Sequence, residues 1–190
     1  MIYDALEFLR GTLNRALVQR FPTAQDWVLL SALTQADGTP PPGLKSRLCL
    51  SLINIERDPT ASGTAPRVQP DEGQMISRAP LLALNLDVLV SAHFEDAYGD
   101  GLKLLSGAID HFQGKPHYRA GADPGLPAGM TKLSVEWVDL NLQEIFNIWT
   151  VLGGHYVPSA LYKVRMLLVA DDRAERAGAP ITRLGLEPRP

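Results

Sequence analysis

The sequence predicts an α+β fold: a single mixed β-sheet of four to five strands, with helices packed mainly on one face and with long Pro/Gly loops. Some segments repeat apolar residues every three or four positions, the period of a helix, and others alternate them every second position, the period of a strand. The 15 prolines and 16 glycines gather between these segments. The expected order of elements is α-β-β-β-α-β-α-β.

The first segment, residues 2–20, is a predicted amphipathic helix that ends before Pro22, because the residue before a proline avoids helical backbone angles. Two predicted strands follow, at residues 27–34 and at residues 47–57. Both faces of the second strand are mainly apolar, so we expect it inside the sheet. Strict alternation places Leu48, Leu50 and Leu52 on one face, and Cys49, Ser51, Ile53 and Ile55 on the other.

Residues 58–79 form the longest stretch without an apolar period. A loop of this length is uncommon in a compact domain and usually carries function or lacks a fixed structure. Its DPTASG segment suggests a phosphate-binding loop, but it lacks a lysine and does not lead into a helix. We therefore expect a segment that is mobile or that a partner orders.

The second half of the chain alternates strands and helices. Residues 80–94 show the clearest strand alternation, and residues 95–113 follow as a helix whose start two glycines weaken. A Pro/Gly loop then leads to a strand at residues 131–140 and to a helix at residues 144–152. Asn141 or the residue before it is the candidate N-cap of that last helix.

Residues 149–171 contain the last strong element of the chain. A helix ends at Gly153 and Gly154, and Pro158 fixes the entry into an alternating apolar segment. We expect this segment to be a central or near-central strand of the sheet.

Length and composition indicate one folded unit. A chain of 190 residues can bury one hydrophobic core, and we expect a single domain over residues 1–170 with a polar C-terminal tail over residues 171–190. The net charge of −3 provides no basic surface for nucleic acid. The N-terminus lacks the pattern of a signal peptide, and no apolar run reaches the roughly 20 residues that span a bilayer. We therefore expect a protein without membrane insertion that stays in the cytoplasm or leaves it by a route that needs no signal.

Cys49 is the only cysteine and lies in an apolar run, which favours a buried structural thiol over a nucleophile. A single cysteine forms no disulfide within the chain, and this fits a reducing compartment.

Sequence motifs of common enzymes are absent: the chain has no GxSxG, HExxH, CxxC or GxGxxG. The glycines of GAIDHFQGKP are too far apart for a phosphate-binding loop, and the four histidines lack the spacing of metal ligands. We therefore assign no catalytic, cofactor-binding or metal-binding residue and expect no enzyme. Asp87 and Arg165 are a hypothetical structural ion pair.

Five segments resemble one family in the same order along the chain: MIYDALEFLR, SLINIERD, LNLDVLVSAHFEDAYGDGLKLLSGAIDHFQGKP, LSVEWVDLNLQEIFNIWTVLGG and YVPSALYKVRM. The most specific part is FQGKP followed by a helix, the GG pair, YVPS and YKVRM. The family comprises the cap, or tail-terminator, proteins of phage-tail-like contractile injection systems, and the resemblance covers nearly all of residues 1–170.

This resemblance implies a structural protein without a cofactor. It would form a ring, expected to be a hexamer, on the end of an inner tube and its sheath, where it would stop polymerisation and bind the tube and sheath proteins. Assembly in the cytoplasm into a particle that is released or membrane-associated is the implied location.

Interface residues follow from the resemblance and from unusual charges. Two basic residues of the last strand lie on one face of an element expected in the interior, so either they pair with acids such as Asp87 or a neighbouring subunit covers them. The resemblance favours the second option. The interface candidates are Arg57, Arg67, Asp71, Glu72, Arg78, Tyr156, Lys163 and Arg165.

Two other functions stay open at this point. One is a small-molecule-binding or enzymatic α+β domain of unknown substrate, which would need a deep pocket with convergent polar groups. The other is a scaffold or adaptor elsewhere in the same particle.

Overall fold

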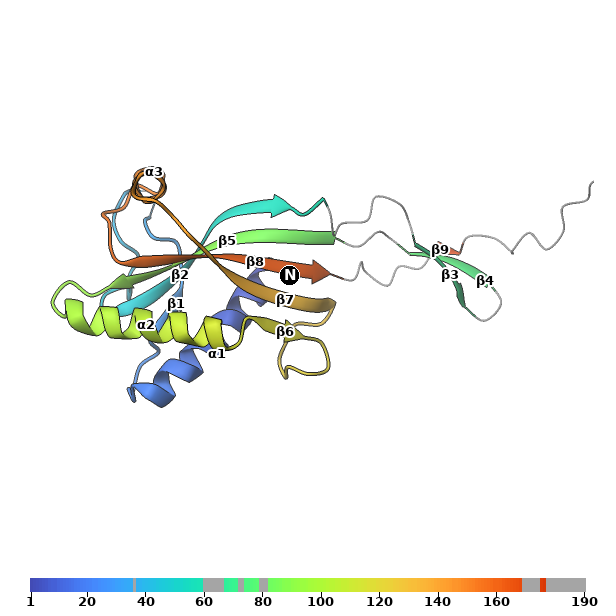
Figure 1. The fold of residues 1–190 in the computed structure, drawn as a ribbon, viewed down its shortest axis with the longest axis horizontal. Helices are drawn as coiled ribbons and strands as arrows, with labels where there is room; N and C mark the ends of the chain where they lie inside the picture. The colour runs from blue at the N-terminus through green and yellow to red at the C-terminus, as the bar shows by residue number, and fades with distance from the viewer. Residues whose placement is uncertain (36, 60–66, 72–73, 79–81, 169–174, 177–190) are drawn as a thin grey trace, which may run out of the picture.

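The computed structural model describes residues 1–35, 37–59, 67–71, 74–78, 82–168 and 175–176. They form a six-stranded sheet in the order β1-β2-β5-β8-β7-β6, three helices, and a second sheet in the order β3-β4-β9 (Figure 1). The helices are α1 (Ile2–Arg20), α2 (Tyr98–Gly114) and α3 (Leu142–Val151). The strands are β1 (Val28–Leu30), β2 (Arg47–Arg57), β3 (Arg67–Asp71), β4 (Gln74–Arg78), β5 (Leu82–His93), β6 (His117–Arg119), β7 (Met130–Val138), β8 (Ser159–Leu168) and β9 (Glu175–Arg176).

The larger sheet confirms the predicted α+β class and the mixed sheet, since β1 pairs with β2 in parallel and the other neighbours are antiparallel. It has six strands instead of four to five, because β6 adds to β7 at a place where the sequence showed only a helix end. β6 is three residues long, which is too short to show an alternation period.

β8 is a central strand, as predicted, because it pairs with β5 on one side and with β7 on the other. Its pairing with β5 runs without interruption from Leu82 opposite Leu168 to Ser91 opposite Ser159. β2 also matches its predicted bounds and lies between β1 and β5, but β1 covers only residues 48–50 of it.

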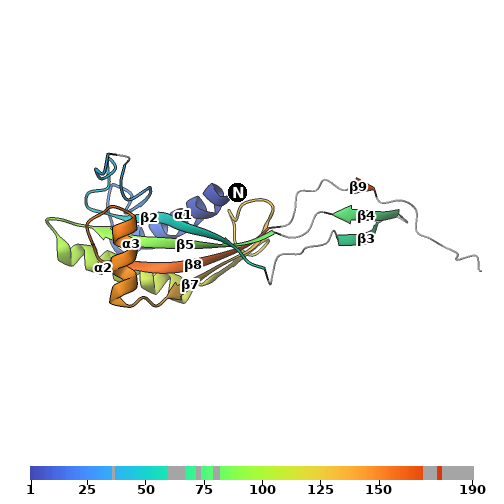
Figure 2. The same cartoon turned by 90° about the horizontal axis from the view of Figure 1, so that it is seen from above.

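Two helices lie on one face of the sheet and the third lies on the other face (Figures 1 and 2). α1 and α2 pack on what we call the α1/α2 face, where side chains such as Leu13, Phe112 and Val164 are buried. α3 packs on the opposite α3 face through Trp149, against Leu161 and neighbouring side chains of the sheet. The predicted N-cap is correct: Asn141 accepts from the Glu144 N–H at 3.0 Å, and Glu144 accepts from the Asn141 N–H at 2.8 Å.

A β-bulge changes the faces of β2 from those predicted. The pairing of β2 with β5 shifts register between Leu52 and Asn54, so that Ile55 pairs with Leu86 on the α1/α2 face. The strict alternation had placed Ile55 with Cys49 on the opposite face, and this was wrong because a bulge inserts one extra residue into the strand.

Residues 58–79 contain regular structure that the sequence did not predict. β3 and β4 form an antiparallel pair, and Ser77 and Ile76 of β4 pair with β9. The second sheet lies beyond the end of the larger sheet at which β8 finishes (Figures 1 and 2). β3 and β4 are five residues long and mostly polar, so they show no apolar period, and β9 lies far from β4 in the sequence. The division into a domain over residues 1–170 and a tail stays a prediction.

In the described part of the chain, no helix combines the length and the apolar character that a membrane-spanning helix needs.

The contact between α1 and α2 generates a prediction at Gly107, where an added Cβ would lie 2.8 Å from Cδ2 of the buried Leu17. Gly107→Val should lower the free energy of unfolding by about 2 kcal/mol, because overpacking forces the helices apart. Gly11→Val, in α1 with open space around the position, should change it by less than about 0.5 kcal/mol. Urea unfolding measures both, and equal effects would contradict the close helix contact.

Candidate functional site

The predicted interface residues Lys163 and Arg165 lie on the α3 face, beyond the part that α3 covers. Lys163 Nζ is 3.3 Å from Glu56 Oε2 and 3.9 Å from Asp87 Oδ1, and Arg165 Nη2 is 3.0 Å from Glu136 Oε2. Asn54 Nδ2 donates to Asp87 Oδ2 at 3.1 Å. We call this group the charged face: Asn54, Glu56, Asp87, Glu136, Lys163 and Arg165.

The hypothetical pair of Asp87 with Arg165 is not formed. The register between the strands explains why. β5 places Asp87 opposite Lys163, and β7 places Glu136 opposite the same lysine and within reach of Arg165. Both basic residues therefore have acidic partners within the chain. These pairs are partly exposed to solvent, so each contributes about 0–1 kcal/mol to folding and leaves the charged face open to a partner.

Tyr156, another predicted interface residue, lies in the connection from α3 to β8 and is largely exposed. Its ring makes an edge contact with Trp149, with 6.0 Å between centroids. The chain bends closely around Trp149, since a Cβ on Gly154 would lie 3.3 Å from its indole ring. The position of Tyr156 follows from two features of the sequence: the Asn141 cap, with which α3 begins, and the small residue Gly154.

A cavity of about 630 Å³ lies beside Tyr156, between the connections that precede β2 and β8. Leu33, Leu44, Trp149 and Pro158 are among the side chains that line it. His93 also reaches it, but burial lowers the pKa of its imidazole, whose Nε2 lies 2.9 Å from Ser91 Oγ. Within the described residues, no group of three or more His, Cys, Asp or Glu side chains could hold a metal ion. Lys45, Glu95 and His155 also line the cavity, and Lys45 Nζ lies 3.6 Å from Glu95 Oε2, so this lysine has an acidic partner at the site.

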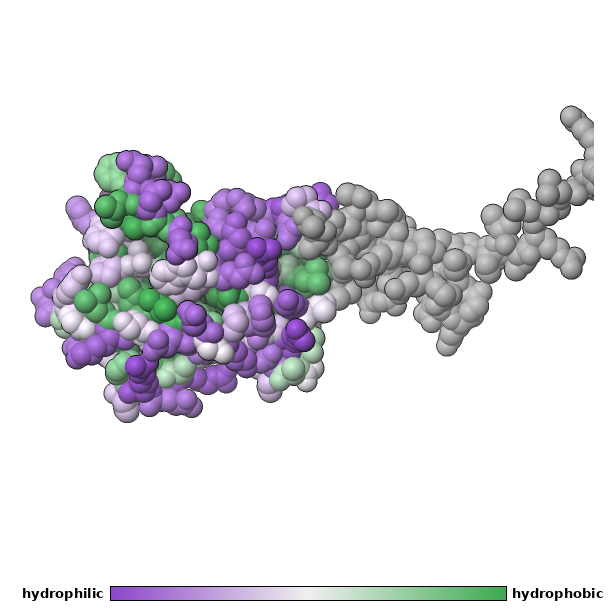
Figure 3. Space-filling model, in the orientation of Figure 1, coloured by the Kyte–Doolittle hydropathy of each residue, from purple (hydrophilic) through white to green (hydrophobic). Residues whose placement is uncertain are grey.

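α3 carries exposed apolar side chains that sequence reasoning missed: Leu142, Phe146 and Val151. Hydrophobic surface is visible at the position of α3 in the space-filling view (Figure 3). Ile145, Ile148, Trp149 and Leu152 form the stripe that packs against the sheet. The signal was available, because the other apolar residues of a ten-residue helix must lie outside that stripe.

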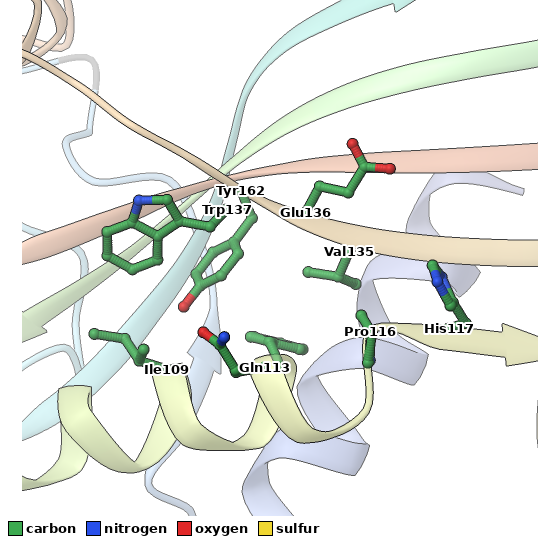
Figure 4. Close-up of a pocket in the computed structure, with 9 residues that line it drawn as sticks. Ile109, Gln113, Pro116, His117, Val135, Glu136, Trp137 and Tyr162 are labelled. Carbon is green, nitrogen blue, oxygen red and sulfur yellow. The ribbon is translucent and has the colours of Figure 1, made fainter.

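A second cavity, of about 360 Å³, lies between α2 and β7 on the α1/α2 face (Figure 4). Ile109, Gln113 and Trp137 line it, together with the Tyr162 side chain that points from β8 toward α2. Trp137 is 48% exposed, and its ring makes an edge contact with the buried Tyr162 ring, with 5.7 Å between the two ring centroids. The Tyr162 hydroxyl has no hydrogen-bond partner in the described structure, and burial raises its pKa.

The remaining interface candidates belong to β2 and to the second sheet. Arg57 ends β2, whereas Arg67 and Asp71 are the first and last residues of β3, and Arg78 ends β4. The structure describes only the backbone of the β3 and β4 residues. Glu72 lies outside the described residues. Their role at an interface stays a prediction.

The unpartnered hydroxyl of Tyr162 predicts an unusual response to its removal. Tyr162→Phe should raise the free energy of unfolding of the isolated chain by up to about 1 kcal/mol, because a buried unpaired hydroxyl costs desolvation energy. Tyr118 is the matched control: it is equally buried, and its hydroxyl lies 3.3 Å from His111 Nε2. Tyr118→Phe should instead lower the free energy of unfolding by about 1 kcal/mol. If urea unfolding shows a lower free energy of unfolding for both variants, the Tyr162 hydroxyl has a hydrogen-bond partner and the prediction is wrong.

Two solved structures share this fold. One is the sheath/tube terminator in the extended state of PVC, an extracellular contractile injection system, with a TM-score of 0.65 and 15% identity. The other is the tube-terminating cap of the anti-feeding prophage, with a TM-score of 0.54 and 15% identity. The alignments cover 100% and 93% of this chain, which spans 64% and 59% of the length of those chains.

Similarity at this identity establishes the fold alone. No curated protein matches the sequence. A family model described as the Pvc16 N-terminal domain matches residues 4–183, and this chain therefore belongs to the Pvc16 N-terminal domain family.

Proposed function

We propose that this protein is a structural subunit that caps the inner tube and the sheath of a contractile injection particle. The observation that carries the proposal is the similarity of fold along the whole chain to a sheath/tube terminator, together with the family match. The tube-terminating cap of the anti-feeding prophage points the same way. The protein would act by binding and not by catalysis.

A subunit of a cap must contact its own copies as well as two other proteins, so it needs several interaction surfaces. The described structure offers the charged face, the exposed apolar residues of α3 and the exposed Tyr156. Exposed apolar patches next to polar groups are typical of surfaces that a partner covers. The proposal includes a homo-oligomeric ring, expected to be a hexamer, that assembles in the cytoplasm and becomes part of the particle.

Among the predicted interface residues, Lys163 and Arg165 have the best-defined surroundings. They are presented on a rigid central strand, and their acidic partners leave them partly exposed. A tube or sheath subunit that brings its own carboxylates could take over these pairings.

Electron microscopy of particles made without this protein tests the proposed function. The expected result is tubes of variable length whose sheath detaches or contracts at one end, and expression of the intact chain should restore normal particles. Particles of normal length with a stable sheath in the deletion strain would contradict the capping function.

Variants of the charged face provide a prediction about binding. Lys163→Gln combined with Arg165→Gln should reduce incorporation into particles at least tenfold, because basic contacts to the partner are lost, while the free energy of unfolding changes by less than about 1 kcal/mol. Quantitative immunoblots of purified particles measure incorporation.

The control replaces two exposed, ion-paired basic residues outside the charged face. Arg20 is 2.6 Å from Asp110, and Lys103 is 2.9 Å from Asp100. Arg20→Gln combined with Lys103→Gln should leave incorporation unchanged. Equal incorporation of both double variants would exclude a binding role of the charged face.

A further inference from the structure

The larger sheet has two free edges, one on each side. β2 pairs with β1 only over residues 48–50, and no other described strand borders its outer side as far as Arg57. β7 pairs with β6 over residues 132–134, and Val135 N–H donates to Pro116 O at 2.8 Å. No described strand borders residues 136–138 of β7. A free strand edge presents unpaired backbone groups to a further strand.

These two edges lie at the same level of the sheet. Register joins Asn54 of β2 to Asp87, Asp87 to Lys163, and Lys163 to Glu136 of β7, in one row across four strands. Because each of these neighbours is antiparallel to the next, β2 and β7 run in opposite directions. A second copy placed beside the first in the same orientation would therefore bring its β2 antiparallel to β7, and the sheet would continue across the contact.

The two edges also have complementary shapes on the α1/α2 face. The bulge in β2 puts Ile55 on this face, where it is 48% exposed. The 360 Å³ cavity opens on the same face beside the free segment of β7, lined by Trp137 and Ile109 and by the unpartnered hydroxyl of Tyr162. An exposed aliphatic side chain at one edge thus has a counterpart at the other edge in a cavity lined partly by Ile109, Val135 and Trp137.

Charge does not oppose this contact. Glu56 at the β2 edge is held by Lys163, and Glu136 at the β7 edge is held by Arg165. Each acid therefore has a basic partner from its own chain when the two edges meet.

We propose that copies of this chain associate head to tail by strand addition, with β2 of one copy beside residues 136–138 of the next and with Ile55 entering the α2–β7 cavity. Strand addition to a free edge is a common mode of protein association. The contact uses different surfaces on the two copies, so it generates a ring when the rotation closes. The proposal rests on the proposed function for the ring and adds the surfaces that build it.

Disulfide cross-linking in assembled particles tests this arrangement. The native thiol, Cys49, is fully buried, so introduced cysteines are the reactive ones. A chain with both Ile55→Cys and Trp137→Cys should give a ladder of covalent multimers on a non-reducing gel after mild oxidation. Chains with only one of these changes should stay monomeric, because residue 55 meets residue 137 and not its own counterpart.

A second pair avoids the loss of the Trp137 ring. Glu56→Cys with Glu136→Cys lies on the α3 face of the same two edges and should also give multimers. Tyr98→Cys with Trp137→Cys is the control without a contact, since the exposed Tyr98 begins α2 and lies near His93, at the end of the sheet away from Ile55. This control should stay monomeric.

The failure of this proposal differs from the failure of the capping function. If particles contain both double-cysteine variants at normal levels, end normally and give no multimers, the head-to-tail contact is wrong and the capping function stands. Multimers from a single-cysteine chain would also overturn it, because they indicate a symmetric contact. If particles without the protein are normal while the multimers form, the contact stands and the capping function fails.

Discussion

The pairing of β5 with β8 holds the larger sheet together. It runs unbroken from Leu82 and Leu168 to Ser91 and Ser159, and it joins the middle of the chain to its last long strand. One face of this pair is apolar along its length and is covered by α1 and α2. The other face is apolar at one end, where α3 packs, and charged at the other. The core and the open surface therefore follow from one register.

That register also determines which surfaces stay open. It aligns Asp87 with Lys163 and places the charged face across four strands, and the short β1 and β6 leave the outer strands partly unpaired. A fold can serve many functions, so the capping role is argued from these surfaces together with the family match. A protein that works by assembly needs open edges and exposed apolar residues, and isolated domains usually cover such features.

Much of the fold could be predicted from local patterns, because α1, β2 and β5 are long segments with regularly spaced apolar residues and α3 has its Asn141 cap. Features that depend on distant pairing could not. β6 is too short to show a period, β3 and β4 are short and mostly polar, and β9 pairs with a strand far from it in the sequence. The bulge that moves Ile55 to the other face, and the choice of Glu136 as the partner of Arg165, are set by register between strands. The sequence therefore identified the charged residues of the candidate site, but it did not show which residues they pair with.

We propose a ring of these subunits, joined edge to edge through one continuous sheet, that ends the tube and the sheath. A cryo-electron microscopy reconstruction of the particle end distinguishes this arrangement from others. We expect a ring of this fold on the last layer of tube and sheath, with β2 of each copy antiparallel to β7 of its neighbour and the Ile55 side chain between Trp137 and α2. A particle end without this fold, or a ring whose β2 and β7 edges face solvent, would contradict it.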